Sequence, residues 1–170
     1  MYARSIWSET QPMAVREPAS DTSIDPTPAP FAPTIDALGK DRDFVVMREV
    51  YRATGGTARK DDLARLLADQ RRGDFVSLAR LSVTGEVFGF EWQHGFWIPM
   101  FQFELRDLSV KPGPRQVVAE LARVFDGWTL AVWFAHANSW LQGRRPVDLL
   151  DSQLPAVLEA ARADRFIAAG

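Results

Sequence analysis

The sequence contains no cysteine and only two histidines, His94 and His136, among its 170 residues. Disulfide bonds, thiol catalysis and thiolate metal sites are therefore excluded, and a chain without cysteine is compatible with a reducing cytoplasm. The histidines lack the His-Glu-x-x-His spacing of a zinc-binding helix, and the sequence has neither a G-x-S-x-G nucleophile elbow nor a phosphate-binding glycine loop. We therefore expect no enzymatic activity, no metal site and no cofactor.

An excess of one charge and a long apolar run are also missing. Twenty Lys and Arg residues are balanced by 22 Asp and Glu residues, which gives a net charge of −2 at pH 7. This balance argues against a strongly basic nucleic-acid coat protein but leaves room for a locally basic face. No apolar run approaches the roughly 18 residues that a membrane span needs, and no signal peptide is visible. We expect a cytoplasmic protein without a membrane partner.

Composition divides the chain into an arm and a folded part. The stretch EPASDTSIDPTPAPFAP alone has five prolines, which remove backbone donors and favour extended conformations. We predict a disordered, proline-rich arm over residues 1–40. The remainder predicts an α+β, predominantly α-helical fold. It consists of a helix-turn-helix-like module with an aromatic β-hairpin over 41–108 and a small helical domain over 109–170.

Hydrophobic periodicity predicts three helices at the start of the first module. A helix around Phe44 should stop at Gly55-Gly56, and two short helices are expected over 57–69 and 74–84, joined by the turn RRGD. Thr57 is a plausible N-cap for the first of this pair. The apolar residues expected to face inward in the second are Phe75 or Val76, Leu78, Leu81 and Val83.

An aromatic hairpin is predicted after these helices. Phe88, Phe90 and Trp92 alternate with period two, His94-Gly95 is a turn signal, and 96–98 forms the returning strand. Two short helices followed by a hairpin are the parts of a winged helix-turn-helix. The module therefore predicts either a DNA-binding element or a retained fold with a structural or protein-contact role.

Cations in this module would neutralise DNA phosphates. Residues 57–72 hold five Lys and Arg against three Asp, a surplus of +2, whereas 41–110 hold ten Lys and Arg against eleven Asp and Glu. The basic surplus is therefore local. The candidate DNA-binding residues are Arg59, Lys60, Arg71, Arg72 and Arg80.

The helical domain is predicted from three amphipathic segments. The first begins near Pro114 and closes at Gly127, and the last is LPAVLEAARADRFIAA. Between them, TLAVWFAHANSWLQ carries apolar residues at i, i+3, i+4, i+7, i+10 and i+11, which predicts one continuous helix ending near Gly143. The stripe consists of Leu130, Trp133, Phe134, Ala137, Trp140 and Leu141.

The segment WFAHANSWLQGRRPVDLLDSQLPAVLEAARADRF resembles the toxin-binding domain of Xre/MbcA/ParS-type antitoxins. The resemblance runs from Pro114 onward, and IPMFQFE resembles the bridge that joins a helix-turn-helix module to this domain in related proteins. The sequence departs from many members after the double leucine, where DSQ and an Ala/Arg-rich helix follow. The shared pattern consists of Phe134, Asn138, Trp140-Leu141, Gly143, Pro146 and Leu149-Leu150.

The resemblance implies a partner rather than a reaction. It implies an antitoxin of a bacterial type II toxin-antitoxin system that binds and neutralises a cognate toxin of the RES or ADP-ribosyltransferase-like, NAD-using class. Operator binding by the first module would be a secondary, autoregulatory role, and a homo-oligomer is expected. The toxin-binding residues implied are Asn138, Trp140, Arg144, Arg145, Arg162, Arg165 and Phe166.

Two alternatives stay open on the sequence. The first alternative is a stand-alone winged-helix-like DNA-binding transcriptional regulator that keeps the helical domain for dimerisation. The second is a scaffold that binds neither a toxin nor DNA. A regulator would bind its own promoter tightly and with strong salt dependence in the absence of any toxin.

Overall fold

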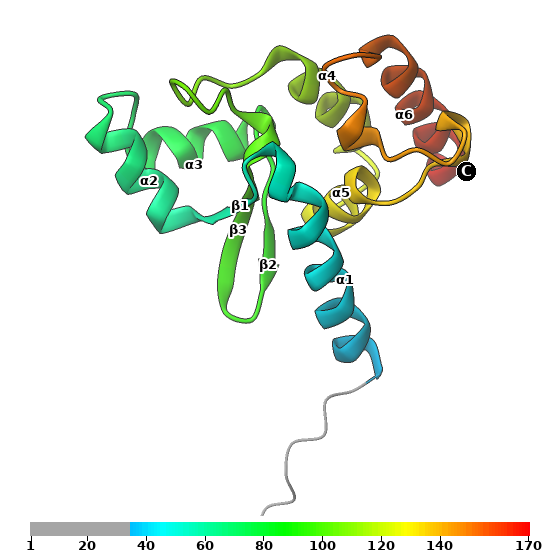
Figure 1. Cartoon of the computed structure of the whole chain (residues 1–170), viewed down its shortest axis with the longest axis horizontal. Coiled ribbons are helices and arrows are strands. Elements are labelled where there is room, and N and C mark those ends of the chain that lie inside the picture. Colours follow the sequence, from blue (N-terminus) through cyan, green and yellow to red (C-terminus); the bar gives the residue numbers. More distant parts are fainter. Residues whose placement is uncertain (1–34) are drawn as a thin grey trace, which may run out of the picture. The chain divides into compact units, whose positions relative to one another are not determined.

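The computed structural model describes residues 35–170, with side chains from Gly39 onward, so most of the predicted arm lies outside the described residues. The fold is α+β and mostly helical, as predicted, with one three-stranded antiparallel sheet in the described part. Figure 1 shows the elements in chain order. They are α1 (Ile35–Tyr51), β1 (Thr57–Arg59), α2 (Lys60–Asp69), α3 (Phe75–Val83), β2 (Phe90–Trp92), β3 (Gly95–Pro99), α4 (Pro112–Leu121), α5 (Gly127–Ala135) and α6 (Leu154–Ala169).

The predicted hairpin is present and belongs to a larger sheet. The strand order is β1-β3-β2, with Ala58 opposite Ile98 and Glu91 opposite Phe96. The turn lies one residue earlier than predicted, because Gln93 and His94 both have positive φ, at 42° and 58°. Two consecutive residues of positive φ are what a tight two-residue hairpin turn requires.

The helix pair α2–α3 lies between β1 and this hairpin, which gives the element order of a winged helix-turn-helix. Helix α2 begins at Lys60, not at 57, because Thr57–Arg59 pair with β3 as strand β1. The prediction that Thr57 caps this helix is therefore wrong. Helix α3 begins after Asp74, whose carboxylate accepts the backbone N–H of Ser77 at 2.8 Å as an N-cap.

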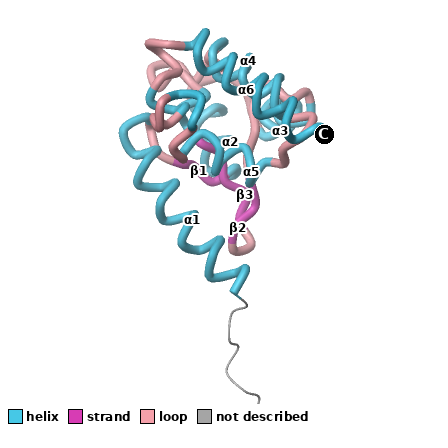
Figure 2. The backbone as a smooth tube through the Cα atoms, turned by 90° about the vertical axis from the view of Figure 1, so that its right-hand side faces the viewer, coloured by secondary structure: helices cyan, strands magenta, loops and turns pink. Residues whose placement is uncertain are grey.

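Two hydrophobic cores hold the described part together. The smaller core lies beneath the helix-turn-helix and includes Leu63, Leu78, Ile98 and Phe103. The larger core joins α1 to the C-terminal helices α4, α5 and α6 (Figures 1 and 2). Helix α1 also starts at Ile35, inside the segment predicted as the arm. It therefore packs with elements of the predicted second domain, although the sequence division placed it with the first.

Gln102 lies where the two cores meet. Phe88 belongs to the larger core, while Met100 and Phe103 belong to the smaller one. The Gln102 side chain is fully buried, accepts the backbone N–H of Phe88 at 2.8 Å, and donates to the carbonyls of Phe88 and Pro99 at 2.9 and 3.0 Å. Its amide thus satisfies backbone groups of two chain segments that cross between the cores.

Helix α5 starts directly on the chain that leads into β2. A Cβ atom at Gly127 would lie 1.9 Å from the carbonyl oxygen of Gly89, so only glycine permits this approach. Asp126 caps the helix by accepting the backbone N–H of Thr129 at 2.7 Å. The side-chain and backbone hydrogen bonds from Thr129 lower the pKa of Asp126.

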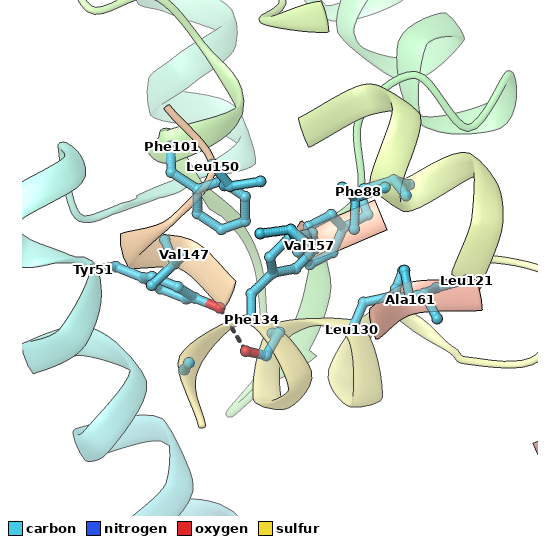
Figure 3. Close-up of a cluster of buried hydrophobic side chains, with 14 of the residues drawn as sticks. Tyr51, Phe88, Phe101, Leu121, Leu130, Phe134, Val147, Leu150, Val157 and Ala161 are labelled. Carbon is cyan, nitrogen blue, oxygen red and sulfur yellow. Dashed lines mark hydrogen bonds between the residues drawn. The ribbon is translucent and has the colours of Figure 1, made fainter. Parts of the chain in front are cut away.

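Tyr51 connects α1 to α5 inside the larger core. Figure 3 shows its hydroxyl directed at a backbone carbonyl, to which it donates a hydrogen bond; the acceptor is Ala131. The side chain is fully buried, and burial raises the pKa of Tyr51 well above its usual value. The phenol is therefore held in its neutral form in the folded state.

We predict that stability falls with rising pH above about pH 10 because of Tyr51. In the unfolded chain Tyr51 ionises near pH 10, whereas in the folded state it keeps its proton. The contribution of Tyr51 to the free energy of unfolding is therefore intact below about pH 10. It is lost as pH rises toward the raised folded-state pKa, at about 1.4 kcal/mol per pH unit. Urea unfolding between pH 8 and pH 11.5 measures this slope.

Tyr51→Phe is the matched control for that slope. It should cost about 1 kcal/mol at pH 8, where the hydroxyl hydrogen bond is lost. The difference in unfolding free energy between the two proteins should then shrink as pH rises. A difference that stays constant up to pH 11.5 would contradict the assignment.

Candidate functional site

The corner after α5 is the first candidate surface, and its backbone differs from the prediction. The predicted helix over 129–142 ends at Ala135, and a separate 3₁₀ turn covers Ser139–Leu141. Asn138 ends the helix because its side-chain oxygen accepts the N–H of Trp140 at 2.9 Å and its own carbonyl accepts the N–H of Gly143 at 2.9 Å. Local bonds of this kind compete with helix continuation.

One carboxylate fixes this corner to α6. Asp164 accepts hydrogen bonds from Trp133 Nε1 at 2.7 Å, from Asn138 Nδ2 at 2.8 Å and from Trp140 Nε1 at 2.9 Å. Both ends of the Asn138 amide are thus used within the chain. The structure therefore gives Asn138 a structural role at the corner, and Asp164, which the sequence did not single out, joins the corner to the last helix.

Trp140 stands on the surface although the helical stripe placed it inward. Its side chain is 57% exposed, while its indole N–H is already bonded to Asp164. Ile167 lies one turn beyond Asp164 on the same helix face and is 65% exposed, and the adjacent Phe166 is 80% exposed. We call Trp140 and Ile167 the C-terminal apolar surface, because Phe166 lies two residues, or about 200°, from Asp164 and faces another side of α6. The C-terminal apolar surface presents an indole ring and methyl groups without a free donor.

The corner arginines are engaged within the chain. Arg144 donates to Gln153 Oε1 at 2.9 Å, and Arg145 pairs with Asp148 at 2.6 Å. Both side chains are exposed, so these contacts are solvent-screened and weak. The two arginines closely follow Trp140 in the sequence, but their side chains bond to residues of their own chain.

The two arginines of α6 are engaged in the same way. Arg162 donates to Glu120 at 3.1 Å and to Glu159 at 2.7 Å, and Arg165 also pairs with Glu120. The hydrogen bond that Arg162 donates to Glu120 raises the pKa of Arg162. A partner carboxylate that binds these arginines must therefore compete with Glu120.

The outward face of α3 is the second candidate surface. Val76 and Val83, predicted to point inward, are 71% and 88% exposed, and Phe75 is exposed as well. The prediction is wrong because Leu78 is the fully buried position, and Val76 lies two residues, or about 200°, away from it. Arg80 shares the outward face, one turn after Val76.

The hydroxyl groups of α3 are used locally. Ser77 donates to the capping carboxylate of Asp74 at 2.9 Å, while Ser82 and Thr84 donate to carbonyls of the preceding turn at 3.2 and 3.3 Å. The hydrogen bonds from Ser77 lower the pKa of Asp74. Arg80 is therefore the polar side chain of the outward face that keeps its donors for another molecule.

A hollow of about 300 Å³ lies between the start of α2, the start of α3 and the hairpin. Lys60 is 4.5 Å from the ring of Phe75 and 5.6 Å from that of Phe96, and Arg59 is 5.4 Å from the ring of Trp97. Asp61 also lines the hollow, so its side-chain formal charge is two cations against one carboxylate, or +1.

The predicted DNA-binding cations differ from the C-terminal arginines in their pairing. Arg72 is 3.6 Å from Asp107. Within residues 39–170, the other four form no ion pair. These four are Arg59, Lys60, Arg71 and Arg80. Their charges are therefore not neutralised by the described part of the chain.

The chain matches no protein-family model, no curated protein and no solved structure. In the described part, no group of three or more His, Asp and Glu residues is placed to hold a metal ion. No helix there is long and apolar enough to cross a membrane. The geometry of the two surfaces is therefore the basis of the functional proposals.

We predict that Asp164→Ala lowers the free energy of unfolding by about 2 kcal/mol. The substitution leaves the Asn138 amide and two indole N–H groups without their shared charged acceptor, and such bonds are worth about 1.5–3 kcal/mol. Urea unfolding measures the loss. Asp151→Ala is the control, because that exposed carboxylate pairs only with Lys111 at 3.3 Å and should change stability by less than about 0.5 kcal/mol. Equal effects of the two substitutions would show that Asp164 does not hold the corner.

Proposed function

We propose that this protein is a cytoplasmic antitoxin that neutralises a cognate toxin by docking the C-terminal apolar surface on it. The observation that supports the proposal is an exposed tryptophan, Trp140, whose ring is held by Asp164 on the helix face that also exposes Ile167. Tryptophan is among the residues that most often anchor protein interfaces. A ring that is already fixed loses little conformational entropy when the partner covers it.

The proposed contact is mainly apolar at its centre. Trp140 has no free donor, so the toxin pocket that receives it needs no acceptor, only apolar walls. Of the four arginines that the resemblance implies, three form ion pairs within the chain and Arg144 bonds to the neutral Gln153. We place all four at the rim, where charges set orientation and association rate more than affinity. The proposed partner is a toxin of the NAD-using class that the resemblance implies.

Co-expression with the product of the adjacent gene tests the antitoxin function. The native chain should bind that product and rescue growth from its toxicity. Trp140→Ala should weaken binding by about 30-fold or more, as expected for an interface anchor worth 2 kcal/mol or more, and Ile167→Ala should act in the same direction. Calorimetric titration of the purified pair measures the affinities.

Val45→Ala is the matched control, because Val45 is an exposed apolar residue of α1, outside the C-terminal apolar surface. Thermal unfolding of each variant checks that the fold is kept. A neighbouring product that is harmless alone, or one that binds Trp140→Ala as tightly as the native chain, would refute the proposal.

We propose duplex DNA binding as a second function of the winged module. Three observations support it: the element order of α2, α3 and the hairpin, the hollow beside Lys60, and the unneutralised charges of Arg59, Lys60 and Arg71 within 39–170. In an antitoxin this activity would regulate its own operon. In a stand-alone regulator it would be the whole function, and it would not require a toxin.

The salt dependence of promoter binding tests this second function. Three phosphate contacts predict a log–log slope of about −2.7, so raising the salt concentration from about 50 to 200 mM should weaken binding about 40-fold. Alanine at Arg59, Lys60 or Arg71 should reduce the slope by about 0.9 each. Arg65→Ala is the control, since Arg65 already pairs with Asp62 at 2.9 Å. If the variants bind DNA with the same salt dependence as the native chain, these three cations do not contact phosphates.

A further inference from the structure

The outward face of α3 has a restricted chemistry. Val76, Arg80 and Val83 follow one another at i, i+4 and i+7, which places them on one side of the helix. Both valines are largely exposed, and the neighbouring Ser77 and Thr84 use their hydroxyls within the helix. The face therefore offers two sets of methyl groups and one guanidinium with free donors.

These groups match particular base edges in the major groove. The C5-methyl of thymine is the apolar group on that edge, and the paired acceptors O6 and N7 of guanine are the usual partners of an arginine. Adenine and cytosine are read mainly by amide and carboxylate side chains, and the face formed by Val76, Arg80 and Val83 carries neither. The chemistry of α3 thus selects thymine and guanine.

We propose that α3 is a base-reading helix in which Val76 and Val83 contact thymine methyl groups and Arg80 binds a guanine between them. Seven residues along a helix span about 10.5 Å, or about three base-pair steps of 3.4 Å. The two thymines should therefore lie about three base pairs apart. This inference rests on the proposed DNA binding and names the sequence that such binding selects.

The surrounding cations place the helix in the groove. Lys60 contacts the ring of Phe75 at the start of α3, and Arg71 lies in the turn that leads into it. Phosphates bound by Lys60 and Arg71 would thus anchor the N-terminal end of α3 and align the helix with the bases along its length. A protein partner could also cover two exposed valines, but DNA accounts for the unneutralised cations as well.

Selection of the full-length protein on a library of random-sequence DNA duplexes tests the reading. The selected duplexes should share two T·A pairs about three steps apart with a G·C pair between them. Replacing either contacted thymine by deoxyuridine removes only a methyl group, and should weaken binding about fourfold. The same replacement elsewhere in the duplex is the control and should have no effect.

Protein variants complete the test. The double change Val76→Ser with Val83→Ser should abolish the penalty for deoxyuridine, and Arg80→Ala should abolish the guanine preference, whereas Leu66→Ser on the exposed side of α2 should do neither. If replacing the thymines by deoxyuridine leaves the affinity unchanged, the base-reading inference is wrong but the DNA-binding function stands. If the protein selects no duplex from the library, the DNA-binding function is wrong as well. If the double serine change alters sedimentation but not DNA affinity, the valines are a protein contact and the inference is wrong.

Discussion

Three hydrogen bonds at Gln102 hold the two cores of this protein against each other. The amide satisfies both the N–H and the carbonyl of Phe88 and also the carbonyl of Pro99, all of them away from water. An apolar residue of similar size would leave these backbone groups unpaired at a cost of about 1–3 kcal/mol each. Gln102 therefore contributes to the relative placement of the helix-turn-helix and the C-terminal helices, together with the pairing of β2 in the larger core with β3 in the smaller one.

The parts of the fold that sequence predicts are those with a local signal. The alternation of Phe88, Phe90 and Trp92 predicted the hairpin because residues that face one side of a sheet recur with period two. Strand β1 has only three residues, and its partner β3 lies about 40 residues further on, so nothing near Thr57 distinguishes it from a helix start. The Asn138 break was missed for a related reason: the apolar stripe continued across it, and the side-chain hydrogen bonds that end α5 leave the spacing unchanged.

The candidate surfaces were predictable only in their residue types. Trp140 was expected in the core because apolar spacing does not reveal that Asp164, in a different helix, takes its indole N–H and leaves the ring at the surface. In α3 Leu78 is buried as predicted, but Val76 and Val83 point outward, because apolar residue type alone does not give the helix phase that follows the cap at Asp74. Nothing in the sequence indicates which candidate arginines pair within the chain, because Glu120, Asp148 and Asp107 reach them only in the folded structure.

The two candidate surfaces differ in how far their cations form ion pairs within the chain. The C-terminal helices neutralise most of their arginines internally and expose apolar rings, which suits a protein partner whose interface centre must be desolvated. The winged module leaves Arg59, Lys60, Arg71 and Arg80 without an ion pair among residues 39–170, which suits phosphates. Because Trp140 and Ile167 belong to elements of the larger core and Val76 and Arg80 to an element of the smaller one, the contact residues proposed for toxin and for DNA are distinct.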